Sequence, residues 1–219
     1  LLDWLAAEFT GRGWSVKHLH RVIMASAAYR RSSRAEAAAC LAADEANTLW
    51  WRQNRRRLEA EAIRDAFLVA AGTLNPAAGG RGFFTTVGRD SLAGQSKPGK
   101  GWEMSPPEEQ NRRSVYGFVK RTLLVPELES FDATNTTSSV GQRSVTTVSP
   151  QALLLSNGGF ARAQAAAMAD RIRSELGSEA PDDGRFVTRG FEVAFARRPT
   201  ARELEIAAAY LARQRSAWS

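Results

Sequence analysis

The chain has 219 residues, of which 43% are apolar and 24% charged, and its formal net charge at pH 7 is +7. This composition is typical of a globular protein and argues against wholesale disorder. The single cysteine, Cys40, excludes an internal disulfide, a Cys-x-x-Cys-His haem site and a multi-cysteine zinc site within these residues. We expect Cys40 to be a small packing residue.

The positive charge is spread along the chain. Residues 1–110 contain 15 Lys and Arg against 12 Asp and Glu, and residues 111–219 contain 15 against 11. Nucleic-acid-binding domains typically gather their basic residues in a patch or tail, so this spread favours general surface charge over nucleic-acid binding. No apolar run reaches the roughly 20 residues that span a bilayer, so no membrane span is expected.

The first residues are typical of a helix interior, with apolar side chains at helical spacing up to Gly11 and Gly13. Because no initiator Met precedes this helix, we expect the chain to be the C-terminal part of a larger protein. Ser15 is a predicted N-cap for a second helix. Its predicted buried stripe is formed by Val16, Leu19, Val22, Ile23 and Ala27.

The strongest amphipathic pattern covers residues 57–73 and predicts a helix that Asn75-Pro76 ends. Its charged residues, Arg64 among them, are placed on the solvent face opposite the apolar stripe. A buried arginine from this segment that bridges neighbouring helices or the irregular loop is the structural interpretation of the charges, and recognition of an anionic ligand by the arginine fork is the functional one. The predicted apolar stripe is formed by Leu58, Ala62, Phe67, Leu68 and Ala71.

Residues 76–112 are rich in Gly and Pro and predict a long irregular segment. Residues 83–87 and 114–119 have the β-branched and aromatic content of short strands. Pro126 is expected at the first position of a short helical turn. The segment therefore predicts at most a small β-hairpin.

The C-terminal part predicts further helices. Ser149-Pro150 is a helix start with Ser149 as N-cap, and Gly177 closes a helix that begins near residue 160. Another helix is expected over residues 183–195, and Thr200 and Glu203 form a capping box for the last one. The chain is thus predicted to be one mostly α domain, residues 1–219, with about seven helices in an irregular arrangement.

Several short segments follow one another in order along nearly the whole chain, among them Leu2-Asp3-Trp4-Leu5-Ala6, Gly13-Trp14-Ser15-Val16, Asn54-Arg55-Arg56-Arg57-Leu58, Arg113-Ser114-Val115-Tyr116, Phe131-Asp132-Ala133 and Ser149-Pro150-Gln151-Ala152-Leu153. Taken together, they resemble the C-terminal domain of unknown function of large planctomycete proteins that often carry cytochrome c-like domains.

The resemblance implies an exported protein, periplasmic or at the cell surface, in which haem c, where present, is bound outside these residues. It implies no cofactor in this part of the chain and supplies no catalytic residue. The partners that it implies are other domains of the same polypeptide and, through carbohydrate-binding modules of related architectures, polysaccharide.

The loop from residue 132 and the helix that follows it are the best candidate for a ligand site. A helix start offers free backbone N–H groups that suit an anion or sugar hydroxyls. The alternative is that Asp132 and Arg143 pair with each other and the threonines cap the turn. Whether the site is catalytic stays open. The candidate ligand-binding residues are Asp132, Arg143, Thr146, Thr147, Gln151 and Asn157.

The histidines and tryptophans are weaker candidates for a metal or ligand site. His18 and His20 lie about 200° apart on a helix and cannot chelate one metal together, so no metal site is expected. Structural packing of one histidine and solvation of the other is the favoured interpretation. The six tryptophans could stack on sugars, but Trp4, Trp14, Trp50 and Trp51 are predicted to pack in helical cores.

Overall fold

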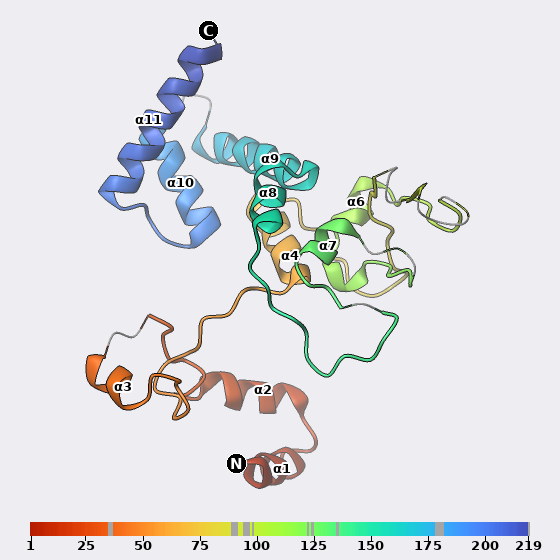
Figure 1. Ribbon diagram of the computed structural model, residues 1–219, viewed down its shortest axis with the longest axis vertical. Coiled ribbons are helices and arrows are strands. Elements are labelled where there is room, and N and C mark those ends of the chain that lie inside the picture. Colours follow the sequence, from red (N-terminus) through yellow and green to blue (C-terminus); the bar gives the residue numbers. More distant parts are fainter. Residues whose placement is uncertain are drawn as a thin grey trace. The chain divides into compact units, whose positions relative to one another are not determined.

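The computed structural model describes residues 1–34, 37–88, 92–93, 97, 99–121, 123, 125–134, 136–177 and 182–218 (Figure 1). In this part of the chain the fold is mostly helical, as predicted, and β structure is limited to isolated bridges. None of its helices is long and apolar enough to cross a membrane. Contacts between Cα atoms group the chain into two compact units, Leu1–Arg57 and Leu58–Ser219, where the sequence suggests one domain.

The first unit contains three short helices, α1 (Leu2–Gly11), α2 (Val16–Ala25) and α3 (Ala38–Ala43). The Ser15 side chain accepts a hydrogen bond from the His18 backbone N–H, which confirms the predicted N-cap. The predicted buried stripe of α2 is wrong, because none of its residues is buried. A helix of ten residues buries a face only against a partner, and α1 covers α2 in part.

Several aromatic side chains of the first unit are also more exposed than the sequence suggests. Trp4, Trp14 and Trp50 are exposed rather than packed in helical cores, and Cys40 is exposed on α3. The residues around Trp50 form a tight loop. In this loop the Asp44 carboxylate accepts hydrogen bonds from the backbone of Thr48 and Leu49.

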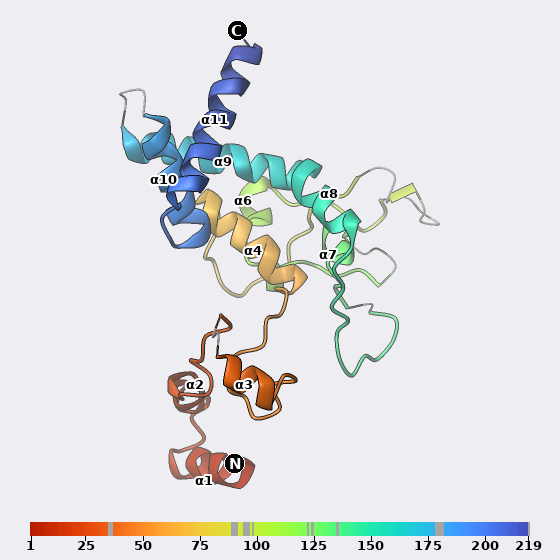
Figure 2. The ribbon, with the colours of Figure 1, turned by 60° about the vertical axis from the view of Figure 1, so that its left-hand side comes forward.

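The second unit is built around two packed helices, α4 (Ala60–Ala71) and α9 (Gly159–Leu176), which lie side by side in Figures 1 and 2. Helix α10 (Asp183–Phe195) packs on α9, and α11 (Ala201–Trp218) packs on α10. The remaining elements are α6 (Pro107–Gln110), a 3-10 turn η1 (Ser114–Tyr116), α7 (Pro126–Ser130) and α8 (Ser149–Asn157).

The buried face of α4 is rotated from the predicted one. Ala60, Leu68 and Ala71 are buried, whereas Leu58 precedes the helix and is exposed. Arg64 follows Ala60 by four residues and therefore shares its buried face, contrary to the prediction of a solvent position. The helix ends earlier than Asn75-Pro76, at Gly72, whose φ of 75° is the left-handed conformation that glycine adopts readily.

Val87 and Trp102 of the Gly/Pro-rich segment form a small apolar cluster with Leu123, against which Phe84 packs. The predicted strand over residues 114–119 is wrong, since its first three residues form η1. Phe83 makes one parallel bridge with Gly117, so the two predicted strands meet without forming a hairpin. Short aromatic segments here satisfy their backbone through side chains and turns instead of a ladder.

The C-terminal helix boundaries follow the sequence closely. Helix α10 covers the predicted residues 183–195, and Gly177 ends α9. The Glu203 carboxylate accepts hydrogen bonds from the backbone N–H and the hydroxyl of Thr200, so the predicted capping box is confirmed. At α8 the start differs by one residue: Val148 is the N-cap and Ser149 the first helical residue.

Candidate functional site

A cavity of about 450 Å³ lies in the second unit, and we call it the Arg64 pocket. Its walls come from α4, α7, α8, the start of α9 and the segments around residues 85–88 and 110–111. A ligand pocket typically combines apolar walls with a few fixed polar groups. The apolar walls are formed mainly by Ile63, Phe67, Leu128, Leu154 and Phe160.

Gly158 shapes the wall where α8 turns into α9. A Cβ atom at this position would lie 2.4 Å from the backbone oxygen of Leu154, which is a clash. A glycine is therefore required for the close turn between α8 and α9. The turn places Leu154 and Phe160, which belong to different helices, on the same pocket.

Arg64 is the central polar group, and its side chain is only 11% exposed. Its Nη1 donates to the Arg112 backbone oxygen at 3.1 Å and to the Ser114 hydroxyl at 3.2 Å, and its Nη2 donates to the Gln110 backbone oxygen. Burial lowers the pKa of this guanidinium. Arginine side chains stay protonated in proteins, so the charge is retained.

Two aromatic rings flank the buried cation. The Arg64 guanidinium carbon lies 5.3 Å from the Phe83 ring centre and 5.4 Å from the Phe160 ring centre. Cation–π contacts of this kind compensate part of the hydration that a buried arginine loses. An Asp65 carboxylate oxygen lies 3.9 Å from Nη1, and among the described residues the cation has no close bidentate acid partner.

The surrounding segment is tied to α4 by further polar contacts. Asp65 accepts hydrogen bonds from the backbone N–H and the hydroxyl of Ser114, both at 2.7 Å. The buried Arg112 donates to the backbone oxygens of Ala77 and Arg81 and lies over the Tyr116 ring. Arginines thus hold the irregular segment against the helix, which confirms the bridging arginine of the structural interpretation.

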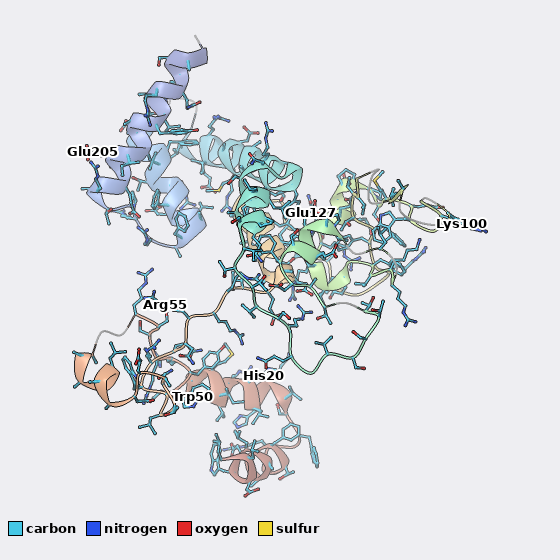
Figure 3. All side chains as sticks on the ribbon, viewed as in Figure 1. His20, Trp50, Arg55, Lys100, Glu127 and Glu205 are labelled. Carbon is cyan, nitrogen blue, oxygen red and sulfur yellow. The ribbon has the colours of Figure 1, made fainter. Side chains whose placement is uncertain are left out.

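Other polar groups of the pocket differ in how far they are already paired. The Gln110 side chain accepts from Thr86 and donates to the Ser105 backbone. Glu127, labelled on α7 in Figure 3, lines the pocket as a second charged group. The hydroxyl of Thr85 is buried without a hydrogen-bond partner among the described residues.

A smaller cavity of about 180 Å³ has four lining residues in common with the Arg64 pocket: Arg64, Thr85, Val125 and Leu128. The predicted residue Arg143 lines it, where its guanidinium forms a bidentate pair with Glu61 at 2.7 and 2.9 Å. This hydrogen-bonded pair lowers the pKa of Glu61 and raises that of Arg143. Arg143 therefore pairs with α4, not with Asp132 as the structural alternative proposes.

The other predicted residues form a separate hydrogen-bonded turn. The Asp132 carboxylate accepts from the Thr146 backbone N–H at 2.8 Å and from its hydroxyl. The buried Gln151 donates to the Ser130 backbone oxygen and to the Thr146 hydroxyl, and it accepts from the Val148 N–H. These contacts bring Asp132, Thr146 and Gln151 together and use the polar groups that a ligand would need.

Thr147 and Asn157 are exposed and do not join this turn. The predicted residues are thus divided among a turn, the rim of the smaller cavity and the surface, and their role in ligand binding stays a prediction. Arg64 lies on the buried face of its helix, opposite to the face predicted for it. Its position four residues after Ala60 and four before Leu68 is the signal that could have found it.

Outside the second unit, the His18 ring Nε2 donates a hydrogen bond of 2.7 Å to the Glu8 carboxylate, while His20 is exposed. This agrees with the packing expected of one histidine and the solvation of the other. Among the residues that the structure describes, no three His, Cys, Asp or Glu side chains gather in a way that could hold a metal ion.

Comparison with known families identifies the chain. A model of the PSD1 family, described as a protein of unknown function (DUF1553), matches residues 1–211. The chain belongs to this family. No curated protein and no solved structure shows significant similarity to it. The resemblance to a domain of unknown function is therefore confirmed, and the family carries no assigned activity to this chain.

Proposed function

We propose that this PSD1 domain is an accessory binding module of an exported protein associated with cytochrome c-like domains, and that the Arg64 pocket is its binding site. The resemblance noted in the sequence supports the context, with haem c held in other domains and a link to polysaccharide processing. The observation that carries the binding role is a cavity of about 450 Å³ whose apolar walls surround a desolvated arginine.

The chemistry of the pocket defines the class of ligand. Its apolar walls suit an aliphatic or aromatic body, because burial of apolar surface contributes about 25 cal/mol per Å². Arg64 is fixed by three hydrogen bonds and two aromatic rings, so it is preorganised to meet a polar end. A carboxylate of the ligand would form an ion pair with the Arg64 guanidinium, and Glu127 could accept hydrogen bonds from donor groups of the ligand.

Binding is favoured over catalysis by the state of the polar groups. Most hydrogen bonds of the Arg64 and Gln110 side chains are formed with backbone groups around the pocket. Such groups orient a ligand, whereas a catalytic acid, base or nucleophile must exchange a proton or bond with it. A catalytic role of the loop from Asp132 to Asn157 has no comparable supporting observation.

Isothermal titration of the whole chain tests the binding role. The probes are octanoate, 3-phenylpropionate, and neutral and acidic oligosaccharides. Ala163 lines the pocket at an exposed position of α9, so Ala163→Trp fills the mouth without entering the core. The matched control is Ala165→Trp, at an exposed position of the same helix outside the lining.

We expect at least one probe class to bind, with affinity reduced roughly tenfold or more by Ala163→Trp and unchanged by Ala165→Trp. Selective binding of the acidic apolar probes would support pairing with Arg64. Selective binding of oligosaccharides would support the polysaccharide link, and no glycan binding by a folded chain would remove that link. Binding that ignores both substitutions would overturn the assignment of this pocket.

A further inference from the structure

Most of the positive net charge of the protein belongs to the first of its two compact units. Residues 1–57 contain ten Lys and Arg against five Asp and Glu, and residues 58–219 contain twenty against eighteen. The first unit therefore carries a net charge of +5 and the second +2. The even spread over the two halves of the sequence conceals this asymmetry, because residue 110 lies inside the second unit.

Helix α2 carries two of these ten basic residues, Lys17 and Arg21, in an amphipathic pattern. At 100° per residue, Val16, Leu19, Val22 and Ile23 share one side of the helix, and Lys17, His20 and Arg21 share the other. His20 is labelled on this helix in Figure 3. The basic side is exposed, and the apolar side contains no buried residue. A basic amphipathic helix is typical of segments that lie on a membrane surface.

The start of α2 is held in a defined position. Ser15 caps the helix, and His18 is hydrogen bonded to Glu8 of α1, which also pairs with Arg12. Trp14, directly before the cap, has a positive φ of 61°, and its ring meets Phe9 edge-on with centroids 5.3 Å apart. Even so, 68% of Trp14 is exposed. The tryptophan is therefore held against Phe9 of α1, directly before the first residue of α2, and is open to solvent.

We propose that α2 and Trp14 form an attachment surface for an anionic lipid–water interface. Lys17 and Arg21 would contact acidic headgroups, while Val16, Ile23 and the Trp14 ring enter the boundary with the acyl chains. Tryptophan is enriched at this boundary because its ring is amphipathic. The helix would lie on the surface rather than cross it, in agreement with the lack of a spanning helix among the described residues.

The observations favour a lipid surface over a nucleic acid. Attraction to phosphates accounts for the basic side of α2 but leaves its apolar side without a role. A lipid interface uses both sides, since acidic headgroups and acyl chains lie within one helix diameter of each other. The two partners therefore predict different effects of substitutions on the apolar side.

Sedimentation of the whole chain with vesicles tests the proposal. Vesicles of phosphatidylcholine alone are compared with vesicles containing about one quarter phosphatidylglycerol, at roughly 0.1 M salt, where surface charges are only partly screened. We expect binding to the anionic vesicles and little binding to the neutral ones. Lys17→Glu with Arg21→Glu reverses the basic side, and Val16→Ser with Ile23→Ser removes apolar surface while keeping the charge.

Each pair of substitutions is expected to reduce the partition coefficient roughly tenfold or more. The control, Arg162→Glu with Arg185→Glu, makes the same change in net charge at exposed positions of the second unit and is expected to have little effect. Far-UV circular dichroism of each variant checks that the helices are retained. Because the two α2 variants change different sides of the helix, one of them still tests the proposal if the other fails to fold.

Three results would overturn the proposal. The first is the absence of binding to anionic vesicles by the folded chain. The second is an equal loss in the α2 charge variant and in the control, which indicates attraction to any polyanion. The third is binding to duplex DNA at least as strong as to vesicles, with no effect of Val16→Ser and Ile23→Ser, which would assign the surface to nucleic acid.

Discussion

The two units of this protein differ in what holds them together. Every buried apolar side chain among the described residues belongs to the second unit, Phe83, Leu68 and Ile172 being the largest that are fully buried. The described buried residue of the first unit is polar: Asn47, whose side chain bonds the Arg52 backbone and Asn54. Burial of apolar surface therefore stabilises the second unit, and local hydrogen bonds and caps shape the first.

This difference explains why similar sequence patterns have different outcomes. An amphipathic helix is stabilised mainly by the surface that covers its apolar side. Helix α4 has such a surface in α9, and its buried face includes even an arginine. Helix α2 separates its apolar and basic residues more strongly onto opposite sides, but the helix α1 that packs on it leaves its apolar side partly exposed. Its apolar side is thus available for a partner, as the proposed lipid contact requires.

The largest expected effect compares one leucine from each unit. Leu68 is fully buried on α4, so Leu68→Ala is expected to lower the free energy of unfolding by about 3 kcal/mol through lost burial and the cavity left behind. Leu49 is 79% exposed, and Leu49→Ala is expected to change it by less than about 0.5 kcal/mol. Urea unfolding followed by circular dichroism measures both. A comparable loss for Leu49→Ala would show that the first unit has an apolar core after all.

The next effect tests the buried arginine of the second unit. Arg64→Met leaves the backbone oxygens of Gln110 and Arg112 without their donor and is expected to destabilise the protein by about 2–3 kcal/mol. Arg113 lies beside the same Asp65 but is 62% exposed, so Arg113→Met is expected to cost less than about 1 kcal/mol. Thermal unfolding compares the two. Equal losses would mean that Arg64 does not anchor the irregular segment.

A smaller effect of opposite sign is expected at Thr85. Thr85→Val removes a buried hydroxyl that has no partner among the described residues and keeps the shape of the side chain, so it is expected to stabilise the protein by about 1 kcal/mol. The neighbouring Thr86 hydroxyl donates to Gln110 at 3.0 Å, and Thr86→Val is expected to be destabilising by a similar or smaller amount. Urea unfolding measures the free energy of unfolding of both variants. A Thr85→Val variant that is less stable than the Thr86→Val variant would show that the Thr85 hydroxyl has a hydrogen-bond partner.

The smallest effect concerns pH. Hydrogen bonds from Arg197 and from the Thr200 backbone lower the pKa of Glu203 from 4.5 to about 2. A carboxyl whose pKa is lower in the folded state contributes stability above its unfolded pKa, and this contribution is lost as the pH falls from about 4.5 to about 2. A carboxyl NMR titration measures the value. Arg197→Gln is expected to raise it, and a pKa near 4.5 in the unmodified chain would contradict the capping geometry.

Local signals in the sequence predicted the helix ends well. The N-cap at Ser15 and the capping box of Thr200 and Glu203 each depend on hydrogen bonds between residues within about four positions of one another. The glycine after α9 has a φ of 89°, a conformation that glycine adopts readily. The irregular segment was also predicted, since Gly and Pro restrict regular structure locally. The strand expected over residues 114–119 failed because contacts with Asp65 and Arg64, some 50 residues away, hold Ser114 in a 3-10 turn.

The candidate site also depends on contacts between residues far apart in the sequence. Its residues come from α4, α7, α8 and α9, and their meeting depends on packing that no single segment specifies. The sequence by itself determined the helical class, most helix boundaries and the polar turn that closes before α8. The tertiary structure decided which side of α4 is buried, that Arg64 lies at a pocket and that Arg143 pairs with Glu61. Caps and turns are satisfied locally, whereas burial and charge pairing depend on which distant surface covers each side chain.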